Sequence, residues 1–138
     1  MATISWTDRS WPKRLCLGFV FLWFFIGGIA HFAATAAEVL IVPPYVPHPR
    51  AIVWISGAFE LAGAAGLLVP VSRRLAGFGL FLLTLAVTPA NIYMIQESQD
   101  FAVPYWILVA RLPLQVLLLA AILWGTASPA SSRMPMSA

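Results

Sequence analysis

The sequence contains few charged residues for its length. Of its 138 residues only eight are Lys or Arg and five are Asp or Glu, whereas 61% are hydrophobic. A soluble domain of this size needs a polar surface that so few charges cannot cover, while in a bilayer the outer surface is itself apolar. The composition therefore excludes an ordinary soluble protein. It predicts an integral membrane protein in contact with the lipid bilayer.

Cysteine is also scarce, and Cys16 is the single one. One thiol excludes an internal disulfide and a C-x-x-C dithiol site, so the chain cannot carry out dithiol redox chemistry by itself. Histidines and carboxylates do not occur at metal-ligand spacing, and we expect no metal site. Ser56 lacks the G-x-S-x-G context of an activated nucleophile, which argues against a serine hydrolase.

The basic residues lie at the ends of apolar runs and form no patch that could hold phosphates. We therefore expect no nucleic-acid partner. Under the positive-inside rule, the side of a membrane protein that is richer in Lys and Arg is cytoplasmic. This predicts cytoplasmic termini, because one side carries six such residues and the other carries Arg50 alone; the six are Arg9, Lys13, Arg14, Arg73, Arg74 and Arg133.

Four apolar runs are long enough to cross a bilayer as helices, which takes about 20 residues each. Short connections between them predict antiparallel neighbours. The expected fold is thus all-α, an antiparallel four-helix membrane bundle over residues 13–125, with an interfacial leader at 1–12 and a disordered tail at 126–138. The first run also resembles a secretory signal, although it is long for one. The four runs cover residues 14–34, 51–70, 75–96 and 104–124.

Prolines divide the chain further. Residues 38–50 contain four of them, which predicts a stiff connector without regular structure. Pro89 and Pro113 lie inside the third and fourth runs. Because proline removes the hydrogen bond to the carbonyl four residues earlier, each is expected to kink its helix and to free the carbonyl of Leu85 or Val109.

Glu60 lies in the middle of the second run, about 14 Å from its external start. A charge at the centre of a span costs roughly 2.5 to 3.5 kcal/mol on insertion scales, so such a side chain normally faces protein or a wet cavity and has a partner. We expect that partner to be Arg111, about two turns into the fourth run. The charge state of Glu60 then depends on their separation, because burial favours the neutral acid and a close guanidinium favours the carboxylate.

Other polar residues are expected at similar depth. His31, Asn91 and Gln115 lie in the external half to middle of their runs, and Ser56 shares the helical face of Glu60. Their faces are lined by small or polar residues, which is typical of the protein-facing sides of membrane helices. We expect all six residues to form a polar core or pocket. Within it, Asn91, Gln115, Arg111 and the freed carbonyls are expected to share one network.

Several roles for this constellation stay open. Glu60 and Arg111 would suit a structural ion pair that fixes helix register, a site for the polar head of a small ligand, or proton transfer. His31 is explained equally by a hydrogen bond to neighbouring backbone and by a place in the pocket.

Five short motifs occur in order between residues 13 and 124. They are G-I-A-H-F at 28–32, I-V-P-P-Y-V-P at 41–47, S-G-x-x-E-L-x-G-x-x-G-L at 56–67, P-A-N at 89–91 and R-L-P-L-Q at 111–115. In this order and spacing the chain resembles the DoxX and DoxX-like family of small four-span membrane proteins. The resemblance implies a four-helix membrane bundle with no settled activity. It also implies that His31, Glu60, Asn91 and Arg111 are the characteristic positions.

Relatives in that family look like membrane subunits of quinone-linked sulfur oxidoreductases, partners of soluble redox enzymes, or assembly chaperones. We therefore expect a non-catalytic bacterial inner-membrane protein that acts as a subunit, or as a lipid- or quinone-binding partner, of a redox or assembly complex. The alternative is a membrane enzyme or quinone-linked oxidoreductase component in which Glu60 and His31 transfer protons. No residue set demands a cofactor, and formation of a homo-oligomer is left open.

Overall fold

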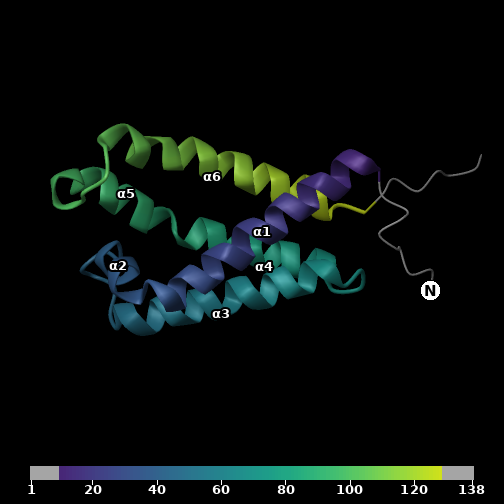
Figure 1. The fold of residues 1–138 in the computed structure, drawn as a ribbon, viewed down its shortest axis with the longest axis horizontal. Helices are drawn as coiled ribbons and strands as arrows, with labels where there is room; N and C mark the ends of the chain where they lie inside the picture. The colour runs from purple at the N-terminus through teal and green to yellow at the C-terminus, as the bar shows by residue number, and fades with distance from the viewer. Residues whose placement is uncertain (1–9, 129–138) are drawn as a thin grey trace, which may run out of the picture.

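The computed structural model describes residues 10–128, and these residues form helices without any strand. The predicted all-α class is thereby confirmed for this part of the chain. Most of the predicted leader and tail, residues 1–9 and 129–138, lies outside the described residues. The elements in chain order (Figure 1) are α1 (Trp11–Ala33), α2 (Thr35–Leu40), α3 (Pro49–Leu68), α4 (Arg73–Ala86), α5 (Thr88–Gln96), the 3-10 helix η2 (Ser98–Asp100) and α6 (Tyr105–Thr126).

Four helical segments are long and apolar enough to cross a membrane, which indicates a multi-pass membrane protein. Each overlaps one of the four predicted runs. The third segment consists of α4 and α5 together, interrupted only at Val87. The segments are Trp11–Ala33, Pro49–Leu68, Arg73–Gln96 and Tyr105–Thr126.

The interruption at Val87 agrees with the predicted effect of Pro89. This proline is in the first turn of α5, where a missing N–H leaves no helical bond unmade. The backbone N–H of Val87 still bonds to the carbonyl of Leu83, which closes α4. In contrast, α6 continues through Pro113 to Thr126 as one helix.

Two predicted boundaries are wrong. Residues 38–40 were assigned to a structureless connector, yet they complete α2. Glu38, Leu40 and the two alanines just before them favour helix, and the first proline of the segment comes only at Pro43. Thr126 was assigned to the tail, yet it lies in the last turn of α6. Its hydroxyl donates to the carbonyl of Ile122 at 2.7 Å, and the residue is buried.

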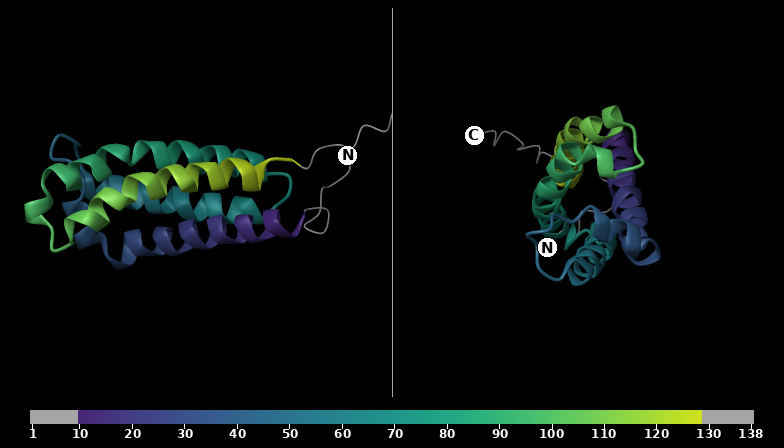
Figure 2. Two further views of the ribbon diagram at one scale, coloured as in Figure 1. Left: turned by 90° about the horizontal axis from the view of Figure 1, so that it is seen from above. Right: turned by 90° about the vertical axis from the view of Figure 1, so that its left-hand side faces the viewer.

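The long helices pack around one hydrophobic core. Helices α1 and α4 each contact both α3 and α6, so that α3 and α6 lie on a diagonal (Figure 2). Figure 1 shows α5 and the start of α6 well apart from α2 and α3 at the α2 end. The core lies toward the other end, where the α3–α4 turn is, because its members come from the corresponding halves of the helices: Leu17, Val20, Phe24, Ala64, Leu67, Leu80, Leu118 and Ile122.

Helices α1 and α3 approach closely at two glycines. A Cβ atom added at Gly57 would lie 2.7 Å from the Cβ of His31 and 3.1 Å from the carbonyl oxygen of Gly28. Small residues of this kind let membrane helices pack backbone against backbone. The contact therefore holds His31 against α3.

Replacing Gly57 with alanine is expected to push α1 away from α3 and to lower the free energy of unfolding by about 2 kcal/mol, as overpacking does in cores. The measurement is unfolding of the purified protein by SDS titration in detergent micelles. Gly79→Ala in α4 is the matched control, because a Cβ there meets nothing within 4 Å. Equal stability of the two variants would contradict the close packing of α1 on α3.

Candidate functional site: a polar cavity between the helices

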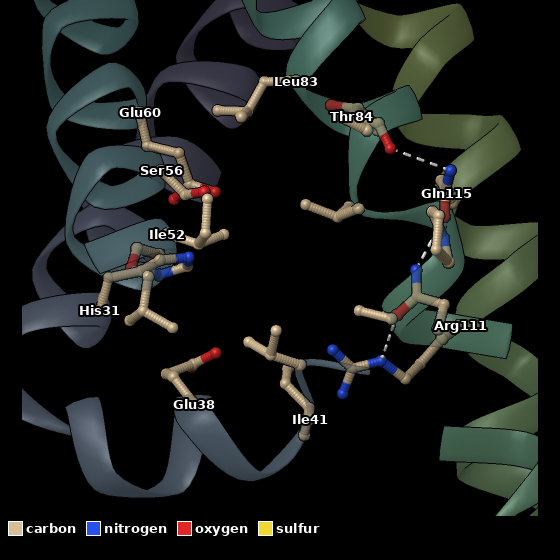
Figure 3. Close-up of a pocket in the computed structure, with 18 of the residues that line it drawn as sticks. His31, Glu38, Ile41, Ile52, Ser56, Glu60, Leu83, Thr84, Arg111 and Gln115 are labelled. Atoms are coloured by element: carbon tan, nitrogen blue, oxygen red, sulfur yellow. Dashed lines mark hydrogen bonds between the residues drawn. The ribbon is translucent and has the colours of Figure 1, made fainter. Parts of the chain in front are cut away.

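A cavity of about 840 Å³ lies between the hydrophobic core and the α2 end. All four long helical segments contribute to its walls, and α2 with the segment after it lines one end (Figure 3). The structure places all six predicted site residues on this cavity and adds two further polar residues, Glu38 and Thr84. The eight are His31, Glu38, Ser56, Glu60, Thr84, Asn91, Arg111 and Gln115.

One wall is a hydrogen-bond network between α6 and the α4–α5 break. The Nε of Arg111 donates to Oδ1 of Asn91 at 3.1 Å, and Nδ2 of Asn91 donates to Oε1 of Gln115 at 2.7 Å. The Nε2 of Gln115 then donates to the carbonyl of Thr84 at 3.0 Å and to Oγ1 of Thr88 at 2.6 Å. Asn91 is only 8% exposed. This wall, shown on the right in Figure 3, fixes the position of the Arg111 side chain.

The predicted network of Asn91, Gln115 and Arg111 is therefore present, with one difference. Sequence reasoning assigned the backbone acceptor to Leu85, whereas Gln115 bonds to the carbonyl of Thr84. Thr84 is buried and faces the interior, while Leu85 is 43% exposed. The carbonyl that the network uses is thus the one on the inward face where α4 ends.

Glu60 lies on the opposite wall, on α3 where this helix meets α1. Its Oε2 atom is buried and has no hydrogen-bond partner among the described residues. A Cβ atom added at Gly27 would lie 2.7 Å from this oxygen, so glycine at that position leaves the space that the carboxylate occupies. His31 and Glu38 line the same side of the cavity as Glu60 (Figure 3). Ser56 lines the cavity one turn away.

The predicted ion pair between Glu60 and Arg111 is wrong. Figure 3 shows the two side chains on opposite sides of the hollow. Arg111 donates through Nε to Asn91, and Oε2 of Glu60 is without a partner in the described part of the chain. The reason is the arrangement of the helices, since α3 and α6 lie on the diagonal and each packs against α1 and α4 instead.

Both interpretations of His31 hold at once. Its Nδ1 atom lies 2.9 Å from the carbonyl oxygen of Gly27 on the same helix, and the residue also lines the cavity. A carbonyl only accepts, so Nδ1 carries the proton and Nε2 is left as an acceptor when the ring is neutral. The hydroxyl of Thr35 donates to the backbone carbonyl of His31 at 2.7 Å, where α1 gives way to α2.

Glu38 is the charged residue of the cavity that sequence reasoning did not select, because it was assigned to a connector. Glu38 follows His31 by seven residues, which is about two helical turns. In a helix this spacing returns to the same face, so it could have predicted that Glu38 lies on the side of His31. The structure puts a short helix at this point and directs Glu38 into the cavity (Figure 3). Within residues 10–128, no three His, Cys, Asp or Glu side chains are grouped as a metal site would require.

Comparison with known proteins identifies the family and nothing more specific. No curated protein and no solved structure matches the chain. A family model described as a domain of unknown function (DUF8561) matches residues 20–126. This range includes every residue that lines the cavity. It covers more than half of the chain, and the protein therefore belongs to the DUF8561 family.

Proposed function

We propose that this protein binds a small amphipathic ligand, a lipid or a quinone, in the cavity between its membrane helices. The observation that carries the proposal is the arrangement of charge: a guanidinium and a carboxylate face one hollow of about 840 Å³ and do not pair with each other. Arg111 is exposed and Glu60 half-buried with one buried oxygen atom, and a charge that lacks an opposite charge within a membrane is costly. A bound molecule with complementary polar groups removes that cost.

We further propose an antiparallel four-helix bundle in the bacterial inner membrane, with both termini cytoplasmic. The start of α1 lies beside the end of α6, as the distance of 3.5 Å between Nζ of Lys13 and the carbonyl oxygen of Ala127 indicates. The α3–α4 turn, with Arg73 and Arg74, belongs to the same end under this topology, while Arg50 begins α3 at the other. The positive-inside rule then places the termini in the cytoplasm.

The resemblance to DoxX proteins supports a role as a non-catalytic subunit or partner of a redox or assembly complex. Proton transfer is a second candidate, favoured by the position of Glu60 and His31 on the same side of the cavity. The two candidate functions predict different results for one variant. Glu60→Gln would abolish turnover of such a complex if Glu60 carried protons, whereas a purely ligand-binding role requires only that the polar contact be kept.

The test of ligand binding is native mass spectrometry of the full chain purified in a mild detergent, followed by solvent extraction of the bound material. We expect the wild-type protein to retain a lipid or quinone and Arg111→Met to lose most of it. Arg74→Met is the matched control, because it removes the same charge from an exposed position in the first turn of α4. A wild-type mass equal to that of the bare chain would overturn the proposal.

A further inference from the structure

We infer that the ligand is a zwitterionic amphipath, a molecule with an anionic group, a primary ammonium group and an apolar tail. This inference rests on the proposed ligand-binding function and names the chemical class of the ligand. Three features of the cavity carry it: the free donors of Arg111, the unpartnered acceptors of the opposite wall, and the order of polar and apolar lining residues along α1 and α6.

The Arg111 wall fits an anion. Only Nε of this guanidinium is bonded to a described residue, namely Asn91. The two terminal nitrogens make no hydrogen bond within residues 10–128, and Figure 3 shows them directed into the hollow. Two parallel N–H groups of arginine match a phosphate or carboxylate in bidentate fashion. Because Asn91 already holds the side chain in place, little ordering of Arg111 is needed on binding.

The opposite wall fits a cation with several donors. Glu60 presents a buried oxygen without a partner, and Glu38 is directed into the same hollow from α2. Between them lies His31, whose Nδ1 bonds to Gly27 and whose Nε2 is an acceptor when the ring is neutral. An ammonium group has three donors and no acceptor. It complements this wall, and Arg111 lies across the cavity (Figure 3).

On α3 the apolar Ile52 lies toward the α2 end and Glu60 about two turns deeper, but on α1 and α6 the polar lining residues lie toward the α2 end and the apolar ones lie deeper. On α1, His31 lies toward the α2 end and Phe24 lies about two turns deeper. On α6, Arg111 lies toward the same end and Leu118 about two turns deeper. A membrane lipid has the same order, with its head at the surface and its tail toward the membrane centre.

Two apolar residues that line the cavity, one on α1 and one on α6, are also well exposed. Ile26 of α1 and Leu114 of α6 both line the cavity and are 62% and 51% exposed. An apolar tail in the cavity can therefore contact exposed apolar surface on both helices. This favours a lipid over a soluble zwitterion with the same head, which would leave the apolar part of the cavity unfilled.

The test is competition among lipids for the full-length wild-type protein, measured by native mass spectrometry after exchange into detergent with equal amounts of each lipid. We expect phosphatidylethanolamine to be bound at least tenfold more than phosphatidylcholine, whose ammonium has no N–H donors, and more than phosphatidylglycerol, which has no ammonium. The mono- and dimethylated ethanolamine lipids should fall in between. Phosphoethanolamine, the head without a tail, should not displace the bound lipid at the same concentration.

A variant tests whether the Glu60 wall sets the preference for one lipid head over another. Glu60→Gln should reduce the preference for phosphatidylethanolamine over phosphatidylglycerol several-fold, and Glu97→Gln, outside the cavity, should leave it unchanged. If Glu60→Gln does not fold, the inference is tested on the wild-type protein alone, by comparing phosphatidylethanolamine with its mono-, di- and trimethylated forms.

The outcomes separate this inference from the proposed function. Preferential retention of phosphatidylglycerol or a quinone would contradict the inference that the ligand is zwitterionic. It would still agree with the proposed ligand-binding function. Displacement by phosphoethanolamine would overturn the requirement for a tail. Retention of no molecule at all would overturn both the inference and the proposed function.

Discussion

Replacing Asn91 with leucine is expected to lower the free energy of unfolding by about 2 kcal/mol, because it removes a side chain that joins α5 to α6 through two hydrogen bonds. The substitution deletes the acceptor of the Arg111 Nε and the donor to Gln115 in one step. Both partners then remain in the membrane interior with an unmet hydrogen bond. Leucine gives no hydrophobic compensation there, since lipid tails are as apolar as leucine itself.

The measurement is SDS-induced unfolding of the purified variant in detergent micelles. Gln96→Leu serves as the control, because it places the same side chain at an exposed position at the end of the same helix. We expect this control to change stability by less than about 0.5 kcal/mol. If Asn91→Leu were as stable as Gln96→Leu, the polar network would not be holding α6 to the α4–α5 break.

The effects of Glu60→Gln and Arg111→Met on stability are expected to be additive in protein stripped of its ligand. A buried ion pair behaves differently, because removing one partner costs about 3–5 kcal/mol and much of this is regained when the other is removed too. When two residues share no contact, the effects of their substitutions on the free energy of unfolding add to within about 0.5 kcal/mol. The structure places the two side chains on opposite walls of the cavity, bonded to different groups or to none.

This double-mutant cycle is measured from the unfolding of the wild-type protein, the two single variants and the double variant in ligand-free detergent. The cycle is then repeated after the ligand is added back. We expect coupling to appear only in the second series, because one molecule now contacts both walls. Strong coupling in the ligand-free series would mean that Glu60 and Arg111 meet directly.

The four spans were predictable because their signal is local and strong. A run of about 20 apolar residues needs no knowledge of its neighbours to be recognised as a span. The break near Pro89 follows from covalent chemistry in the same way. Helix α2 was not predictable on these grounds, because six residues beside a proline-rich segment give little periodicity, and a single turn and a half of helix depends on the packing of α3 beside it.

The composition of the site was predictable, whereas its pairing was not. Polar residues on small-residue faces of apolar helices must face protein, and this placed Glu60, Asn91 and Arg111 in the interior. Which of them touch depends on the order of helices around the core. The spacing of residues along each helix does not predict that α3 and α6 lie on a diagonal of the bundle. This arrangement separates Glu60 from Arg111.

The gap between the two charges is also set by features outside the site itself. Gly27 and Gly57 let α1 pack closely on α3, which keeps Glu60 beside α1. Asn91 and the α4–α5 break hold Arg111 on the other side. The cavity is therefore a consequence of two separate packing arrangements, one on each wall.

The most direct measurement is a crystal structure of the full-length protein grown from a lipidic mesophase without removal of its native lipid. We expect an elongated molecule in the cavity, with one polar group within hydrogen-bond distance of the Arg111 guanidinium and another at the Glu60 carboxylate. A carboxylate of Glu60 lying within about 4 Å of that guanidinium, with the cavity closed between them, would contradict the ligand-binding site.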